Sequence, residues 1–352
     1  MSKSELSAVE QTAATRTRRS PEPMDPRLTD IQPGGGVIIR LEQAWGRCRR
    51  WYLKTFRRRY VERMAALRKG DGNRCPHEVL DPRDLKFYRN QGGWHWAAED
   101  DPFTWRDRIP FAREGLAELL VFSVLFFGAA GLFGWMATWP SLGTVGSTVC
   151  GLLSVTAAVL GILIVWFFRD PPRQIPQGAG LVVSPADGKV VTIEEIDHDD
   201  EIGGPAVLIG IFLSIFNVHI NRMPIAGRII RLRYREGKCL NALRPESVRE
   251  NEQLAVLLEG SQPPHRPMIV RQITGAIARR IVCRLKPGDE LSAGERFGMI
   301  KLGSRTELVL PREEGLRICV RTGQAVKAGL TRFATYESDS TSPLKNGGQT
   351  NL

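Results

Sequence analysis

The sequence lacks the common short motifs of nucleotide-binding, metallopeptidase and serine hydrolase sites. It contains no G-x-G-x-x-G, no Walker A loop, no H-E-x-x-H and no G-x-S-x-G segment. Its six cysteines stand singly, without a C-x-x-C pair, so zinc-ribbon and thioredoxin-type classes have no support. Scattered thiols of this kind are typical of a reducing compartment rather than of a disulfide framework.

The first twenty residues lack an apolar run, so a cleavable secretory signal is not predicted. What the chain has in excess is positive charge. The 352 residues include 49 Lys and Arg against 38 Asp and Glu, which gives a net charge of +11. A basic chain can attract nucleic acid, anionic lipid or acidic substrates, so the location of the charge must decide among them.

The N-terminal third divides into a tail and a basic region. Residues 1–36 are rich in Ser, Thr, Pro and Gly and predict a disordered tail. Residues 37–113 predict a partly helical region in which aromatic residues are interleaved with Arg and Lys. Such a helix suits an anionic membrane surface, but an ordinary solvated face with a packing stripe explains it equally well. No base-reading domain follows, so we expect no nucleic-acid partner.

Two uncharged segments indicate a transmembrane hairpin within residues 116–168. Residues 119–139 and 142–168 contain no charged side chain, and each is long enough to cross a bilayer. Only two residues separate them, so both ends should lie on one side. Residues 1–113 carry 23 Lys and Arg against 15 Asp and Glu, whereas the connecting loop has no basic residue. The positive-inside rule therefore predicts a cytoplasmic location for both soluble parts, at the cytoplasmic membrane. The alternative is a buried helical hairpin in a soluble protein.

Residues 169–334 alternate short β-rich runs with Gly, Pro and Asn turns, which predicts a β-dominated domain. The phrases SPADGKVV and KPGDELSAGERFGMIK are similar to the two halves of a biotinyl or lipoyl barrel. This favours a barrel-sandwich-like α+β architecture, anchored by the hairpin. The lysine that such carrier modules need, within M-K-M or D-K-A, does not occur. Residues 335–352 predict a second disordered tail.

Three polar residues in apolar surroundings supply an acid, an imidazole and a hydroxyl, the groups that activate a serine nucleophile. They are Asp187 in LVVSPADGKV, His219 in FLSIFNVHINRMPIAG and Ser304 in KLGSR. Each has a plainer interpretation. Asp-Gly is a hairpin-turn signal, a lone histidine after a strand is usually structural, and Gly-Ser is typical of a β-bulge. Residue types and spacing alone leave a membrane-anchored β domain of unknown activity.

The order of these segments closely resembles the phosphatidylserine decarboxylase proenzyme family. The matching segments are SPADGKV, FNVHINRMPIAG, YREGKCLNA, NE at 251–252, RQITGAIARRIVC, KPGDELSAGERFGMI and LGSR. The resemblance runs from about Phe167 to Pro311. It is greatest to the short bacterial and archaeal branch, whose cleavage motif is Gly-Ser-Arg, and residues 1–113 lie outside it.

The resemblance implies a self-processing carboxy-lyase that converts phosphatidylserine to phosphatidylethanolamine and CO₂. The chain would cut itself between Gly303 and Ser304, with Ser304 as nucleophile, His219 as base and Asp187 orienting His219. The products would be a heterodimer of residues 1–303 and 304–352. Position 304 would carry a covalent, self-generated pyruvoyl group that forms a Schiff base with the substrate amine. Neither PLP nor a metal is expected.

One departure from the family concerns proton transfer to the substrate. Other branches carry a second histidine three residues before the conserved one, whereas this sequence has Phe216. The role given to that histidine must then fall to His219, water or another group. Two other activities stay open: decarboxylation of archaetidylserine or a related lipid, and a non-catalytic membrane-tethered carrier or scaffold.

Overall fold

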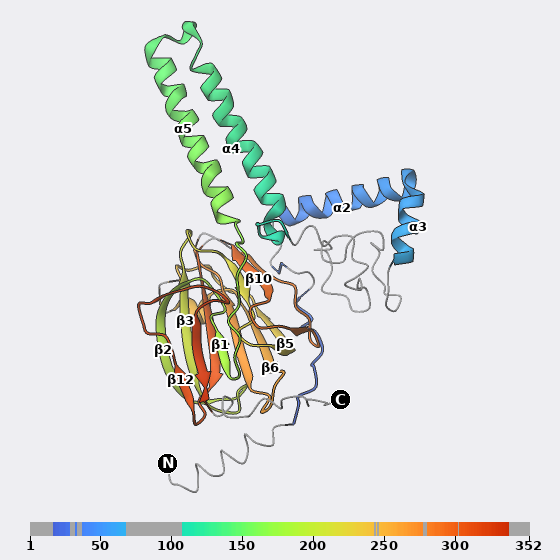
Figure 1. Ribbon diagram of the computed structural model, residues 1–352. Helices are drawn as coiled ribbons and strands as arrows, with labels where there is room; N and C mark the ends of the chain where they lie inside the picture. Colours follow the sequence, from blue (N-terminus) through green and yellow to red (C-terminus); the bar gives the residue numbers. More distant parts are fainter. Residues whose placement is uncertain are drawn as a thin grey trace, which may run out of the picture.

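The computed structural model describes residues 17–28, 32–33, 37–67, 108–242, 244, 246–276, 280–301 and 303–337. A hairpin of two long helices projects from one end of a β domain, and a pair of N-terminal helices lies beside the base of the hairpin (Figure 1).

The hairpin consists of α4 (Leu116–Met136) and α5 (Gly143–Phe167), joined through a short 3₁₀ turn, η5 (Pro140–Leu142). Both helices are apolar almost all round, half of their residues are exposed, and few are buried. Close packing between them depends on small residues: the Ser154 hydroxyl donates to the Ala130 carbonyl over 2.7 Å. By length and composition, both helices could cross a membrane. Their exposure differs from that of a buried hairpin in a soluble protein.

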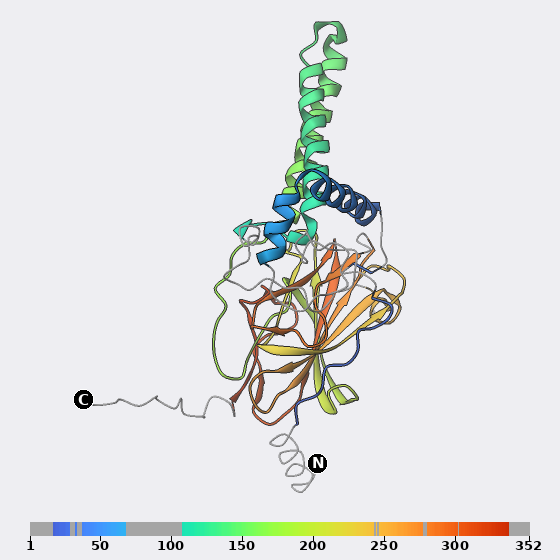
Figure 2. The same cartoon turned by 90° about the vertical axis from the view of Figure 1, so that its right-hand side faces the viewer.

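The predicted basic region contains two helices, α2 (Val37–Phe56) and α3 (Arg58–Leu67). A 3₁₀ turn, η4 (Arg113–Gly115), precedes α4. Helix α2 leaves the base of the hairpin and runs across its axis (Figures 1 and 2). Trp45, Trp51 and Phe56 on α2 are exposed. The rest of the predicted basic region, residues 68–107, lies outside the described residues.

The β domain confirms the expected β-dominated class. Its large sheet has eight strands in the order β13-β2-β3-β11-β7-β6-β5-β9, and two three-stranded sheets have the orders β4-β10-β8 and β1-β14-β12. One short helix, α6 (Ser247–Glu250), lies between β5 and β6. The strands are β1 (Leu181–Val183), β2 (Gly188–Asp199), β3 (Gly204–Leu213), β4 (Ile220–Arg222), β5 (Gly227–Arg235), β6 (Gln253–Gly260), β7 (Pro267–Ile273), β8 (Arg280–Cys283), β9 (Glu290–Leu291), β10 (Arg296–Lys301), β11 (Ser304–Pro311), β12 (Leu316–Ile318), β13 (Ala325–Val326) and β14 (Arg332–Tyr336).

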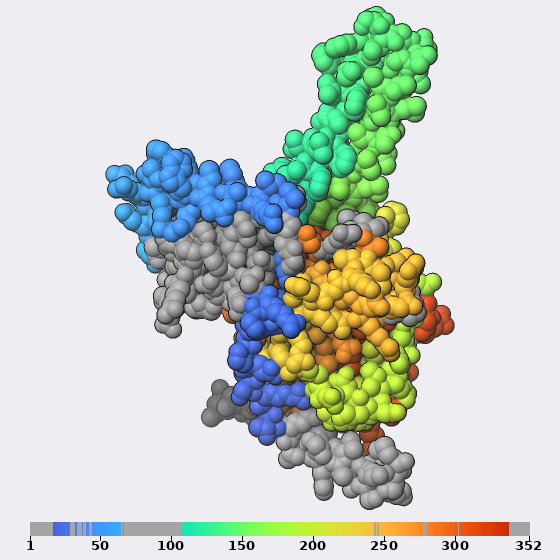
Figure 3. All heavy atoms as spheres, turned by 180° about the vertical axis from the view of Figure 1, so that it is seen from behind, coloured from blue at the N-terminus to red at the C-terminus, as the bar shows by residue number. Residues whose placement is uncertain are grey.

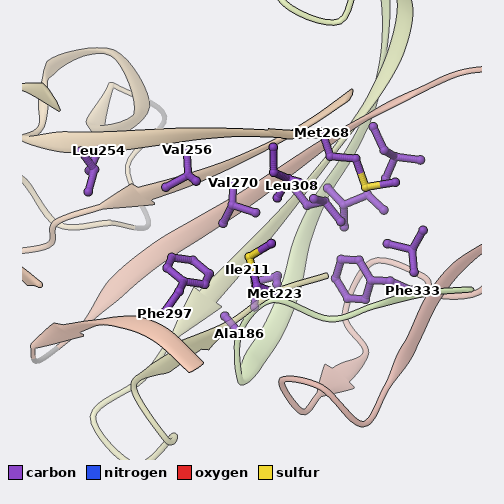
Figure 4. Close-up of a cluster of buried hydrophobic side chains, with 14 of the residues drawn as sticks. Ala186, Ile211, Met223, Leu254, Val256, Met268, Val270, Phe297, Leu308 and Phe333 are labelled. Atoms are coloured by element: carbon purple, nitrogen blue, oxygen red, sulfur yellow. The ribbon is translucent and has the colours of Figure 1, made fainter. Parts of the chain in front are cut away.

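The main core lies on one face of the large sheet. Side chains alternate along a strand, so Ser304, Thr306 and Leu308 of β11 share a face. Leu308 is fully buried in a cluster with Ile211 of β3 and Val270 of β7. Figure 4 shows these side chains gathered with those of Phe297, Met223 and Phe333. Burial of each large apolar side chain contributes about 1.5–3 kcal/mol, so the strand that begins at Ser304 is firmly held.

One end of the large sheet faces the hairpin. Strand β11 begins at Ser304 directly opposite Leu213, where β3 ends. The loop that follows Leu213 is bonded to the end of α5, because Trp166 Nε1 donates to the Phe216 carbonyl over 3.3 Å. Helix α4 contacts the strand on the other side of the predicted cleavage point, since Lys301 of β10 forms a buried ion pair with Glu118. The predicted cleavage point therefore lies between the sheet and both helices.

Two stretches expected to be disordered belong to the fold. Residues 17–28 lie along the β domain (Figure 3), with Leu28 buried in the main core. Their backbone is bonded to it, as Glu22 N donates to the Ile230 carbonyl over 2.9 Å. At the other end, β14 includes Tyr336, whose buried hydroxyl donates to the Pro311 carbonyl. The prediction of disorder was wrong for these residues, because long-range hydrogen bonds and apolar burial offset their conformational entropy. Residues 1–16 and 338–352 lie outside the described residues.

Candidate active site

Ser304 is the first residue of β11 and is completely buried. Its hydroxyl oxygen has no hydrogen-bond partner among the described residues. Leaving a buried hydroxyl unpaired costs about 1–3 kcal/mol, so such groups are uncommon and call for an explanation. A serine oxygen that is held in place without a partner is free to act as a nucleophile.

Gly303 precedes it in a left-handed conformation, with φ +63°. Glycine adopts this conformation readily, whereas other residues rarely do. A Cβ atom on Gly303 would meet nothing within 4 Å, so the requirement is conformational rather than steric. The opposite holds at Gly275, where a Cβ atom would lie 2.0 Å from the Gly303 carbonyl oxygen. The carbonyl next to Ser304 is thus packed against the backbone of Gly275, a contact that the sequence did not reveal.

His219 is fully buried and reaches the same peptide segment. Its Nδ1 atom lies 2.8 Å from the Asn217 carbonyl oxygen, which can only accept a hydrogen bond. We therefore assign the ring proton of the neutral imidazole to Nδ1, and Nε2 keeps its lone pair. The Gly303 N–H donates to Nε2 over 3.3 Å. The basic nitrogen of His219 is consequently aimed at the residue that precedes Ser304.

The environment of His219 keeps its ring uncharged. Burial lowers the pKa of His219 to about 4, and the Arg169 charge acts in the same direction. The Asn217 carbonyl and the Asp187 carboxylate oppose the shift. Phe167, the last residue of α5, covers the ring, with 4.5 Å between the two ring centroids. An apolar contact with the buried imidazole thus comes from the hairpin.

The structure places Asp187 differently from the expectation. Its carboxylate accepts two hydrogen bonds from Arg173, at 2.6 and 2.9 Å, and one from the Ala328 N–H at 2.8 Å. Among the described residues, no hydrogen bond joins Asp187 to His219. The expected orienting contact is made instead by the Asn217 carbonyl. Asp187 is close enough for its charge to raise the pKa of His219, so its influence on the ring is electrostatic.

A row of side chains across the large sheet includes a buried carboxyl. Register places Thr274 opposite both Ser304 and Glu252, since Arg305 and Gln253 both pair with Ile273. Thr274 N donates to the Glu252 carbonyl over 3.0 Å. Residues directly opposite share a face, and two strand spacings put the Glu252 and Ser304 backbones about 10 Å apart. Burial raises the pKa of Glu252 to about 7.

Buried polar side chains brace the strand that carries Ser304. Asn221 Nδ2 donates to the Thr306 hydroxyl over 3.1 Å, and Gln272 Nε2 donates to Asn221 Oδ1 over 2.9 Å.

No cluster of three or more His, Cys, Asp or Glu side chains that could hold a metal occurs within the part of the chain that the structure describes.

The fold and the site together define a mostly β-sheet protein with a completely buried, unpaired serine hydroxyl next to a left-handed glycine. Comparison with known proteins identifies its family. A family model for phosphatidylserine decarboxylase matches residues 160–334. The phosphatidylserine decarboxylase proenzyme of Rhodopirellula baltica is 51% identical over 253 residues, which are 72% of this chain and 99% of that protein. The proenzyme of Syntrophus aciditrophicus is 37% identical over 67% of this chain and 99% of its own length. The chain therefore belongs to the phosphatidylserine decarboxylase family.

Proposed function

We propose that this chain is a self-processing, pyruvoyl-dependent decarboxylase that converts phosphatidylserine to phosphatidylethanolamine and CO₂. The observation that carries the proposal is the Ser304 hydroxyl, buried and unpaired, beside a left-handed Gly303 whose amide reaches His219. The reaction comes from the family, since the curated relatives are named phosphatidylserine decarboxylase proenzymes.

Self-cleavage begins when Ser304 Oγ attacks the Gly303 carbonyl carbon and His219 Nε2 takes the hydroxyl proton. The Gly303 N–H, which donates to Nε2 in the uncut chain, must first release that lone pair. The peptide C–N bond breaks, an ester forms, and the His219 imidazolium gives its proton to the freed Ser304 nitrogen. β-Elimination then transfers the Ser304 Cα proton to the neutral His219 ring, expels the Gly303 carboxylate and leaves dehydroalanine at position 304. Addition of water releases ammonia and leaves a ketone.

Each neighbouring group has a distinct role in this step. The Asn217 carbonyl holds the histidine tautomer in which Nε2 is basic. The Asp187 carboxylate stabilises the imidazolium through its charge once the proton has moved. Gly275 supports the carbonyl under attack. The low pKa of His219 keeps the ring neutral, and therefore able to accept a proton, across the physiological pH range.

The surroundings of Ser304 fit a covalent pyruvoyl group. Because the hydroxyl makes no hydrogen bond, its conversion to a ketone removes none that the fold depends on. The neighbouring side chains on the same face, Thr274 and Thr306, are uncharged. Once formed, the group supplies an electrophilic carbonyl that takes the substrate amine and accepts the electron pair left by CO₂.

For the return of a proton to the substrate, the chain offers Glu252 in place of the missing second histidine. Phe216, which occupies the position of that histidine, has no proton to donate, and 59% of its surface is exposed. Glu252 lies on the same face as Ser304, and burial raises its pKa to about 7. A carboxyl group in this range can hold a proton near neutral pH and release it.

The hairpin supports a location at the cytoplasmic membrane with the β domain on the cytoplasmic side. A diacyl phospholipid stays in the bilayer, so the enzyme has to work at the surface. The mature protein would be a heterodimer of residues 1–303 and 304–352. The site residues meet the headgroup rather than the lipid tails, so archaetidylserine is an alternative substrate with the same chemistry.

Denaturing electrophoresis and intact mass measurement test the proposal directly. Wild-type protein should give a large chain ending at Gly303 and a 49-residue small chain (352 − 303) that is blocked to Edman degradation. Ser304→Ala should remain one chain without activity, whereas the control Ser261→Ala should cleave normally. His219→Ala should also remain uncut while staying in the membrane fraction. A wild-type preparation that remains one chain would refute self-processing.

A further inference from the structure

The loop between β3 and β4 displays apolar side chains on a domain that otherwise exposes very few. Within residues 169–337, so far as the structure describes them, three large apolar side chains are exposed: Ile215, Phe216 and Leu330. Two of these are adjacent at the tip of one turn. Single exposed apolar residues are ordinary, but a pair at one tip, beside two apolar helices, points to a contact with lipid.

The turn is rigid, so the exposed pair is held in place. Asn217 Oδ1 accepts hydrogen bonds from the Ser214 N–H and hydroxyl, at 2.9 and 2.8 Å, and Asn217 N donates back to the Ser214 carbonyl. The backbone at the tip is also tied to the end of α5, because the Phe216 carbonyl accepts from Trp166 Nε1 at 3.3 Å and from Arg169 at 2.8 Å. The two apolar side chains make none of these bonds.

The neighbours of the tip are residues typical of a membrane interface. Trp166 is exposed in the last turn of α5, and the Arg169 guanidinium lies 4.0 Å from its ring centroid. Tryptophan and arginine at the end of an apolar span are typical of the headgroup layer. Since the Phe216 backbone contacts both side chains, the tip lies at the same depth. Arg169 donates one hydrogen bond to the Trp166 carbonyl and one to the Phe216 carbonyl, which accounts for two of its five N–H groups.

The same loop leads directly to the catalytic groups. Asn217, which follows the tip, holds His219 Nδ1, and His219 Nε2 accepts from Gly303 next to Ser304. Ser304 itself is completely buried, so a lipid headgroup has to enter past residues at this end of the sheet.

We propose that the turn carrying Ile215 and Phe216 inserts into the headgroup layer beside the end of α5. There it forms, with Trp166 and Arg169, the edge across which an anionic phospholipid passes from the bilayer to Ser304. This inference rests on the proposed function for the identity of the lipid. Its partner is the lipid surface itself, so soluble substrates gain nothing from the insertion.

The test compares two substrates in one preparation. Full-length protein is reconstituted in phosphatidylcholine vesicles, and CO₂ release is measured from dioleoyl phosphatidylserine in the bilayer and from dihexanoyl phosphatidylserine in solution. For Ile215→Ser/Phe216→Ser, the ratio of bilayer to soluble turnover should fall about tenfold, equivalent to 1.4 kcal/mol. The matched control, Ile215→Leu/Phe216→Leu, should keep the wild-type ratio. Self-cleavage of each variant shows that it is folded.

An unchanged ratio in the serine variant, or an equal fall in the leucine control, overturns the proposal. A second readout does not depend on catalysis: Phe216→Trp should add fluorescence that phospholipids with brominated chains quench, after subtraction of the wild-type signal. Absence of that quenching also overturns the proposal. This is the result expected if the tip binds another protein instead of lipid. If wild-type protein releases CO₂ from neither lipid, the proposed function fails, and the quenching still decides whether the turn inserts.

Discussion

The contact between Phe167 and His219 places a residue of the hairpin against a buried histidine of the β domain. Burial lowers the pKa of His219 from 6.5 to about 4. A shift of this size corresponds to about 3 kcal/mol in favour of the neutral ring. Removing the phenyl ring with Phe167→Ala should admit water to the imidazole and return the pKa toward 6.5, whereas Phe167→Leu should keep the site dry.

The expected magnitude follows from the fraction of neutral histidine. At pH 5.5, a group with a pKa near 4 is about 97% neutral, and one with a pKa of 6.5 is about 9% neutral. Cleavage by Phe167→Ala should therefore be about tenfold slower than wild type at pH 5.5, and the two rates should converge by pH 8. Phe→Ala substitutions in a core also cost about 3–5 kcal/mol of stability, so the comparison requires folded protein.

The assay is the rate at which newly synthesised precursor splits, followed by gel between pH 4.5 and 8 in detergent. The stability of the folded protein also decreases at low pH. The unfolded histidine binds a proton below pH 6.5 and the folded one only near pH 4, so wild-type stability falls as the pH drops through this window. If Phe167→Ala cleaves with the same pH midpoint as wild type, water exclusion by Phe167 is not what lowers the pKa.

Three further substitutions test other parts of the site. Gly275→Ala should slow cleavage at least tenfold, because its Cβ atom would displace the Gly303 carbonyl; a normal cleavage rate would contradict the contact. Lys301→Met should leave Glu118 buried without its partner and cost about 3–5 kcal/mol in thermal unfolding, with partial recovery when Glu118→Gln is added. Glu252→Gln should still cleave but lose decarboxylation. It should also lack the decline in stability that the raised pKa of Glu252 imposes between about pH 4.5 and 7, where the folded carboxyl keeps a proton that the unfolded one has lost. Retained turnover would exclude Glu252 as the proton donor.

Much of the architecture could be predicted from local properties of the chain. A long uncharged run is stable as a helix that is shielded from water. The sequence therefore predicted α4 and α5 closely, and their bounds differ from the expected segments by only a few residues. Short β-rich runs separated by Gly and Pro likewise predicted the β domain from local properties of the chain. The tail at 17–28 was mispredicted because its order comes from strands more than 200 residues away.

The sequence by itself determined the family resemblance and the candidate residues: the order of the motifs predicts roles for Asp187, His219 and Ser304 and a cut at Gly303–Ser304. Only the tertiary structure decided how these residues meet. Strand register brings Gly275 against the Gly303 carbonyl. The bend after β3 places His219 Nδ1 within hydrogen-bond distance of the Asn217 carbonyl. Asp187 forms an ion pair with Arg173. The physical reason is that a tautomer, a pKa and a close backbone approach depend on atoms from distant segments, whose distances no local pattern specifies.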